Sequence, residues 1–313
     1  MVRIRIDRLT ARVAGMALCL VAHSTQAQAQ AQTVFACEPE WAALTRVLLP
    51  EAKIFVATHA RQDPHHIEAR PALIAQLRSA DVAVCTGAEL EAGWLPTLQQ
   101  RAGNAKVQDG APGMFYAADN VVLIDPQPGA IGSPFAGDVH AAGNPHLHTD
   151  PHRILVVSQA LSEQLQKLQP AQKQTIAKRQ AEFETAWKAR IAAWERRAAP
   201  LRGREVVAQH SGFTYLWRWL GLKQVADLEP QPGMAPTPGH LQRLLNQLRP
   251  QPPLAVVVSS YQDPRSARWL VGQLGGKLPL LLLPATVPDV NAPDALGLWL
   301  DQLLDELLKT VER

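Results

Sequence analysis

The sequence lacks the short motifs that mark several large classes of enzyme. Its 313 residues contain neither G-x-G-x-x-G nor G-x-x-x-x-G-K, the glycine-rich loops that bind phosphate groups, and no H-E-x-x-H. No internal repeat of fixed short period is present, and no low-complexity tract follows the first 31 residues. These absences argue against a nucleotide-binding domain, a zinc protease of the H-E-x-x-H type and a repeat protein.

The chain also lacks a strong charge of either sign. It has 31 Lys and Arg against 28 Asp and Glu, a formal net charge of +3. The excess lies in the first 31 residues, where four arginines accompany the single Asp7, so the rest of the chain is neutral. We therefore expect no nucleic-acid partner and no binding to an anionic membrane. A content of 47% apolar and 19% charged residues is typical of a globular protein and excludes intrinsic disorder.

The first 31 residues have the layout of a secretory signal peptide. Basic residues precede an apolar run at 13–22, which is too short to span a bilayer, and alanines alternate with glutamines at 27–31. Cys19 follows Leu18 where a lipoprotein signal needs a small residue, so we expect export without a lipid anchor. A disordered basic tail is the alternative interpretation.

Cysteine is scarce, with three residues in the whole chain. Cys37 and Cys85 lie outside the predicted signal peptide, and each ends an apolar, strand-like run. If these strands are neighbours in one sheet, the two residues come within disulfide range, in a compartment that permits the bond. Two small buried apolar side chains are the alternative, and an oxidised pair would offer no thiolate to a metal.

Unbroken apolar runs alternate with amphipathic segments along most of the chain. Runs without in-and-out alternation indicate strands whose sheets are covered by helices on both faces, so the predicted fold class is α/β. We expect each sheet to be mostly parallel. The candidate strands are 33–37, 54–57, 82–85, 121–124, 154–157, 206–208, 254–259 and 280–283.

The segment 170–199 predicts one long helix. It has no glycine and no internal proline, and apolar residues recur at spacings of three, four and seven. We interpret it as a rigid helix that joins two lobes. The predicted organisation is a signal peptide at 1–31, an N-terminal lobe at 32–169, the linking helix at 170–199 and a C-terminal lobe at 200–313. A long surface helix of a single domain is the alternative.

Ten histidines are unevenly placed, and three of them are candidate metal ligands. His65 and His146 each follow an Asx-Pro pair, which restricts the backbone and caps the turn, and His210 lies at the junction between the predicted strand 206–208 and the next helix. Three neutral imidazoles and one oxygen form a common zinc site. From the residues alone, capping or surface histidines are an equal alternative.

The order of several motifs resembles that of the periplasmic zinc- and manganese-binding proteins of bacterial ABC importers, the cluster A-I binding proteins. The resemblance extends over nearly the whole chain after residue 31. It includes Asp63-Pro64-His65-His66-Ile67-Glu68, Gly87-Ala88-Glu89-Leu90-Glu91, Gly143-Asn144-Pro145-His146, Ala208-Gln209-His210 and Leu228-Glu229-Pro230.

The resemblance implies a metal site and its ligands. It places the first three ligands on His65, His146 and His210, and the fourth on Asp289 or on water. Asp289 is otherwise a cap for a terminal helix that begins near Ala292. Imidazole-rich coordination favours Zn²⁺ over Mn²⁺.

The resemblance further implies a monomeric periplasmic protein that captures the divalent ion and passes it to an ABC permease in the inner membrane. One alternative is a secreted zinc hydrolase with Glu68 as general base. Another is a structural or adhesive surface protein that uses zinc for stability. Glu68 is also a candidate acceptor that orients one imidazole, or a favourable charge near a helix start. The sequence lacks the long histidine-rich loop of some zinc-binding relatives, and we expect His140 and His148 to lie on a solvated loop. A remnant of that histidine-rich loop, gathering zinc near the mouth of the site, is the alternative.

Overall fold

The computed structural model describes residues 31–127 and 138–312. The predicted signal peptide falls, except for Ala31, outside these described residues. None of the helices among them is both long enough and apolar enough to cross a membrane.

The first sheet contains four parallel strands in the order β2-β1-β3-β4. Residue Val34 of the central strand pairs with Ile54 on one side and with Val82 on the other. The elements of this lobe are β1 (Thr33–Ala36), α1 (Pro39–Leu48), β2 (Lys53–Val56), α2 (Pro71–Arg78), β3 (Val82–Cys85), α3 (Leu95–Ala102) and β4 (Met114–Tyr116).

The second sheet repeats this arrangement, with four parallel strands in the order β6-β5-β7-β8. Its elements are β5 (Glu205–Ala208), α6 (Thr214–Leu220), β6 (Lys223–Asp227), α7 (Pro238–Leu248), β7 (Ala255–Ser259), α8 (Arg265–Gln273), β8 (Leu280–Leu283) and α9 (Ala295–Leu308). The α/β class and the two parallel sheets are confirmed.

Two predicted strands are wrong. Residues 121–124 form a loop, and 154–157 lie inside helix α4 (Pro151–Leu168). The Asp150 carboxylate accepts a hydrogen bond from the His152 backbone N–H, and Pro151 occupies the first turn, so the chain enters a capped helix there. Strand β4 was not predicted, because its three residues lie within a segment rich in glycine and proline.

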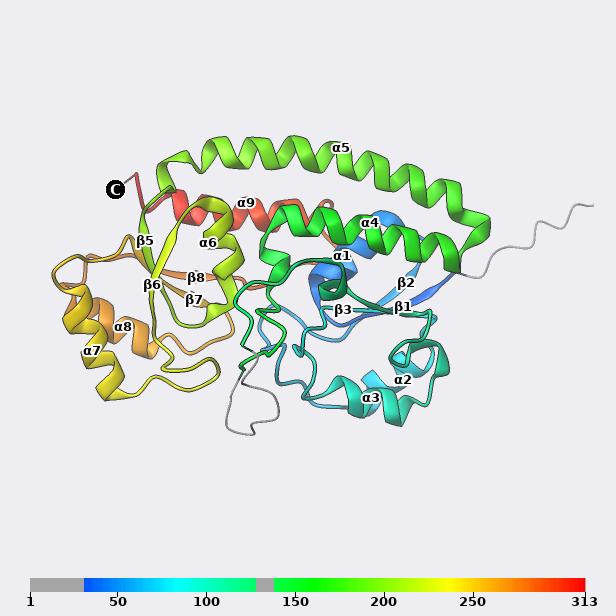
Figure 1. Ribbon diagram of the computed structural model, residues 1–313, viewed down its shortest axis with the longest axis horizontal. Helices are drawn as coiled ribbons and strands as arrows, with labels where there is room; N and C mark the ends of the chain where they lie inside the picture. Colours follow the sequence, from blue (N-terminus) through cyan, green and yellow to red (C-terminus); the bar gives the residue numbers. More distant parts are fainter. Residues whose placement is uncertain (1–30, 128–137, 313) are drawn as a thin grey trace, which may run out of the picture. The chain divides into compact units, whose positions relative to one another are not determined.

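The predicted long helix is confirmed as α5 (Lys173–Arg197), preceded by a short 3₁₀ turn at Pro170–Gln172. It runs past α4 and α9 and contacts both (Figure 1). The Trp187 indole donates a hydrogen bond to the Pro151 carbonyl at the start of α4, and the Trp194 indole donates one to Asp301 on α9. The helix is thus bonded to segments of both lobes.

One hydrophobic cluster connects the two lobes. Val34 and Val84 of the first sheet share it with Val206 and Val257 of the second, through side chains of α1, α4, α5, α6 and α9. The opposite faces of the two sheets pack in two separate clusters, one per lobe. Because a wide hinge motion would open the shared cluster to water, we expect the lobes to move little relative to each other.

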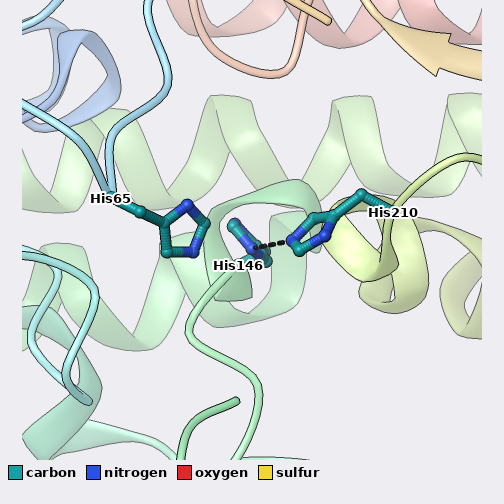
Figure 2. Close-up of side chains that lie close together, drawn as sticks. All are labelled: His65, His146 and His210. Carbon is teal, nitrogen blue, oxygen red and sulfur yellow. Dashed lines mark hydrogen bonds between the residues drawn. The ribbon is translucent and has the colours of Figure 1, made fainter. Parts of the chain in front are cut away.

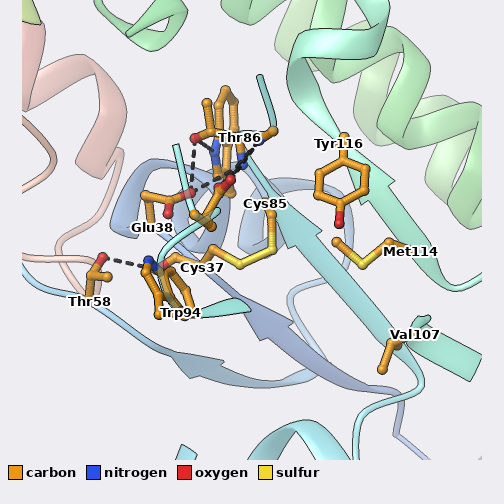
Figure 3. The surroundings of a disulfide bond; sticks show 12 residues. Cys37, Glu38, Thr58, Cys85, Thr86, Trp94, Val107, Met114 and Tyr116 are labelled. Atoms are coloured by element: carbon orange, nitrogen blue, oxygen red, sulfur yellow. Dashed lines mark hydrogen bonds between the residues drawn. A yellow bond between two sulfur atoms is a disulfide. The ribbon is translucent and has the colours of Figure 1, made fainter. Parts of the chain in front are cut away.

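Cys37 and Cys85 form a disulfide at the carboxyl ends of neighbouring strands β1 and β3 (Figure 3). Their Cα atoms are 4.8 Å apart, and both side chains are fully buried. The bridge expected from the two strand-like runs is therefore confirmed.

Candidate metal centre

Three imidazoles from distant parts of the chain meet at one point. One ring nitrogen from each of His65, His146 and His210 lies within 4.8 Å of the other two, and each residue is only 5% exposed. The Nε2 atoms of His146 and His210 are 3.3 Å apart, although 64 residues separate them in sequence (Figure 2). The three histidines indicated by the sequence thus form one buried cluster.

Asx turns position two of these rings. The His65 backbone N–H donates to the Asp63 carboxylate at 3.0 Å, and the His146 backbone N–H donates to the Asn144 side-chain oxygen at 2.9 Å. Proline follows the Asx residue in both turns and restricts the backbone. The direction of each imidazole is therefore set by local sequence, as the Asx-Pro-His pattern predicted.

Side chain and backbone groups of the second lobe bond to the turn that carries His146. The Tyr215 hydroxyl donates to the Asn144 carbonyl at 2.7 Å and accepts from the Ile124 backbone N–H at 3.1 Å. The Asn144 side chain donates to the carbonyl of Ser211, the residue after His210. These contacts fix the spacing of His146 and His210, which neither turn could set alone.

Two carboxylates set the tautomers of two of the rings. Asp63 lies 2.7 Å from Nδ1 of His65, and Glu229 lies 2.8 Å from Nδ1 of His210. A carboxylate at Nδ1 holds the proton there and leaves Nε2 with a free lone pair, the form that binds a metal ion. The acceptor role considered for Glu68 belongs instead to Asp63, because the Glu68 side chain is exposed.

The rings differ in their affinity for protons. Burial, together with the neighbouring His65 and His210, lowers the pKa of His146 well below its usual value. Burial also acts to lower the pKa of His210, but the hydrogen bond and charge of Glu229 outweigh it and raise the pKa above 6.5. His210 is therefore a ring on which protons compete with a metal ion.

Acid is expected to weaken metal binding through His210. Because the pKa of His210 is higher in the folded than in the unfolded protein, protonation of this ring stabilises the metal-free fold below about pH 6.5. That contribution is lost as the pH rises through the pKa that the ring has in the folded protein. Metal binding needs the neutral ring, so Zn²⁺ affinity should fall about tenfold per pH unit below that pKa. Glu229→Gln should move this onset to lower pH and weaken Zn²⁺ binding at neutral pH about 10- to 100-fold.

Titrations of both proteins with Zn²⁺ between pH 5 and 8 check this. Glu68→Gln is the matched control, because it removes an exposed carboxylate near His65 and should leave the profile unchanged. Identical pH profiles for the wild type and Glu229→Gln would refute the role of Glu229.

The structure does not bring Asp289 to the three imidazoles. Its side chain is exposed, and its carboxylate accepts a hydrogen bond from the Asn291 backbone N–H at 2.9 Å. The carboxylate thus caps a local turn a few residues before α9, which begins at Ala295. The capping alternative expected Asp289 just before a helix that begins near Ala292, and the structure places it in a turn just before α9.

The solvated loop expected for His140 and His148 is wrong for His148. His148 is buried, lies against the Trp299 ring and approaches the Ala285 carbonyl to 2.9 Å. His140 is half-buried in a loop, and its ring stacks on that of His65 with centroids 5.3 Å apart. Burial and the charges of His65 and His210 lower the pKa of His140 to about 3, so its ring is neutral at physiological pH.

A cavity of about 680 Å³ adjoins His210. His210 lines it together with the carboxylates of Asp63, Asp138 and Glu229. Negative charge along a cavity raises the local concentration of cations. These carboxylates therefore favour the presence of a cation beside His210.

Comparisons with known proteins agree with this architecture. The family model described as "Zinc-uptake complex component A periplasmic" matches residues 34–307. The zinc-binding lipoprotein AdcA of Streptococcus pneumoniae is 23% identical over 247 residues, which cover 78% of this chain and 48% of AdcA. The chain thus spans about half the length of this curated relative.

Solved structures share the fold at low sequence identity. A crystal structure of ZnuA superposes with a TM-score of 0.74 at 17% identity and covers 90% of this chain and 99% of its own. The SBP FpvC from Pseudomonas aeruginosa, in complex with Mn²⁺, gives a TM-score of 0.69 at 17% identity over 90% of this chain and 99% of its own.

The family match, residues 34–307, includes both sheets, the long helix and all three clustered histidines. The chain therefore belongs to the ZnuA family, the periplasmic A components of zinc-uptake complexes.

Proposed function

We propose that this protein captures Zn²⁺ outside the cytoplasm and delivers it to an ABC permease in the inner membrane. One observation carries the proposal: His65, His146 and His210 place ring nitrogens within 4.8 Å of one another in a buried site that segments of both lobes build. His65 belongs to the first lobe and His210 follows β5 of the second, so an ion held by both would bridge the lobes.

The donor set favours zinc. Neutral imidazoles suit Zn²⁺, whereas Mn²⁺ prefers carboxylate and water oxygens. Asp63 and Glu229 are hydrogen-bonded to Nδ1 atoms, so their charge offsets that of the ion without replacing an imidazole. Zn²⁺ is therefore the proposed cargo, and Mn²⁺ the weaker competitor.

Release at the permease should involve small movements. The hydrophobic cluster shared by the two lobes opposes wide opening, so local shifts of the loops that carry the ligands are the proposed route. The proposal includes a signal peptide at 1–31, a periplasmic location and a monomeric state.

Catalysis is not part of the proposal. A hydrolase would need Glu68 as general base beside the ion, but the Glu68 side chain is exposed and the family is one of zinc-uptake components. A transport protein must exchange its ion, whereas a protein that uses zinc for structural stability retains it.

Binding should appear as stabilisation of the folded protein. After removal of metal by a chelator, free Zn²⁺ at 100 times the dissociation constant should add about 2.7 kcal/mol to the free energy of unfolding. For a chain of this size that corresponds to a rise in Tm of about 5 °C in a thermal melt. An unchanged Tm and no bound zinc by elemental analysis would refute the proposal. Zinc that a competing chelator cannot remove would indicate a structural ion instead.

A further inference from the structure

The carboxyl groups of Glu38 and Glu91 meet in the interior of the first lobe. Glu38 and Thr86 each follow a cysteine of the disulfide, so the bridge holds them side by side, and Glu91 lies five residues beyond Thr86 (Figure 3). The two glutamates are only 2% and 3% exposed. We propose that this pair retains one proton at slightly alkaline pH, on Glu38, and that the proton locks the turn at 86–91.

Both carboxyls accept hydrogen bonds from Thr86. Its backbone N–H lies 2.6 Å from Oε1 of Glu91 and 3.2 Å from Oε2 of Glu38. Its hydroxyl accepts from the Trp41 indole at 2.8 Å and donates to Oε2 of Glu38 at 2.9 Å. The Gly87 N–H adds a bond of 3.0 Å to Glu91. Because one N–H serves both carboxyls, two ionised groups would repel each other at short range in a buried site.

No cation offsets these charges in the part of the chain that the structure describes. Neither Glu38 nor Glu91 forms an ion pair with a lysine, arginine or histidine there. The nearby Glu40 is a third carboxyl, and its own partners are His148 and Thr286. The titratable side chains that line a small cavity with Glu38 are Glu40, His59, His146, His148 and Tyr261, and Tyr116 lies near Glu91.

The unequal hydrogen bonding of the two carboxyls assigns the proton to Glu38. Both oxygens of Glu91 accept backbone N–H bonds, whereas Oε1 of Glu38 is buried without a partner among the described residues. Burial, and then the charges of Glu91 and Glu40, raises the pKa of Glu38 well above its usual value. Burial raises the pKa of Glu91 to about 7, because the bonds from Thr86 and Gly87 offset only part of it. Above neutral pH, Glu91 is therefore the ionised member and Glu38 the acid.

The turn between these groups needs contacts to hold it. Residues 87–89 have φ angles of 78°, 50° and 68°, the left-handed region that is unfavourable for residues with a Cβ. Glu91 closes the turn by accepting from the N–H groups at its start. The Glu89 carboxylate accepts from the Ala141 N–H at 2.8 Å and so connects the turn to the segment that leads to His146. Loss of the proton would place two charges at the start of this turn and loosen it.

The retained proton links folding to pH. In the unfolded chain Glu38 ionises near its ordinary pKa of about 4.3, whereas the folded protein keeps it protonated, so folding takes up one proton. The stabilisation is fully present in acid and is lost as the pH rises toward the pKa that Glu38 has in the folded protein. Glu38→Gln supplies a neutral group of similar shape that needs no proton.

Denaturant unfolding of the metal-free protein at pH 6, 7 and 8 tests the proposal. Relative to that of Glu38→Gln, the folding equilibrium constant of the wild type should fall about tenfold per pH unit, because the two proteins differ by one proton taken up on folding. Glu68→Gln is the matched control, since it removes an exposed carboxylate and should keep the pH dependence of the wild type.

Infrared spectroscopy at pH 8 gives a second readout that does not depend on stability. We expect the C=O stretching band of a carboxylic acid in the wild type and in Glu68→Gln, and its loss in Glu38→Gln. Equal pH dependence of wild type and Glu38→Gln, or a wild-type spectrum without the acid band, would overturn the proposal. The wild-type spectrum decides even if Glu38→Gln folds poorly. These outcomes do not involve zinc, so they leave the proposed function intact.

Discussion

Replacement of His146 by alanine should weaken Zn²⁺ binding about 100- to 1,000-fold. The affinity of four-ligand zinc sites in small domains corresponds to about 10–16 kcal/mol, so each ligand accounts for roughly 2.5–4 kcal/mol. His146 belongs to the buried cluster, and its nitrogen lies 3.3 Å from that of His210. His65→Ala and His210→Ala should have comparable effects, since the three rings form one cluster.

Competition with a chelator of known affinity measures the loss. His152→Ala is the matched control, because His152 is exposed, pairs with Glu195 and should leave the affinity unchanged. The Tm of each metal-free variant must be recorded, so that a loss of binding is not confused with unfolding. Wild-type affinity in all three ligand variants would show that zinc binds elsewhere.

Reduction of the disulfide should lower the free energy of unfolding by about 4 kcal/mol. The bridge closes a loop between residues 48 apart in sequence, and the chain-entropy relation for that length gives about this value. Because both sulfurs are buried at the ends of the central strands, the loss should appear as reduced stability of the whole fold rather than local fraying. Denaturant unfolding of the oxidised and reduced protein provides the measurement.

The comparison between oxidised and reduced wild type is the cleanest, because it changes no side chain. Cys37→Ala with Cys85→Ala should be at least as unstable as the reduced protein, since each substitution also removes a packed sulfur atom. Equal denaturation midpoints for oxidised and reduced protein would contradict the expected contribution.

Local sequence was sufficient to predict a structural feature when a single segment of the chain determines that feature. The long helix followed from a glycine-free and internally proline-free segment with apolar residues at helical spacing, and α5 differs from the prediction only at its ends. The turns before His65 and His146 followed from their Asx-Pro pairs.

The strand predicted at 154–157 was wrong because a short run rich in β-branched residues fits a strand or a buried helix equally well. The packing of α4 against α5 decided in favour of the helix.

The sequence by itself determined the fold class, the long helix and three histidines of the site, because apolar periodicity, turn chemistry and family motifs are local properties. Tertiary structure alone decided which groups surround those histidines. His140 is 75 residues from His65, and Glu229 is 19 from His210, yet both pairs are in contact. Such contacts depend on how two sheets and their loops pack, and no spacing along the chain encodes them. The same packing left Asp289 at a solvent-exposed turn.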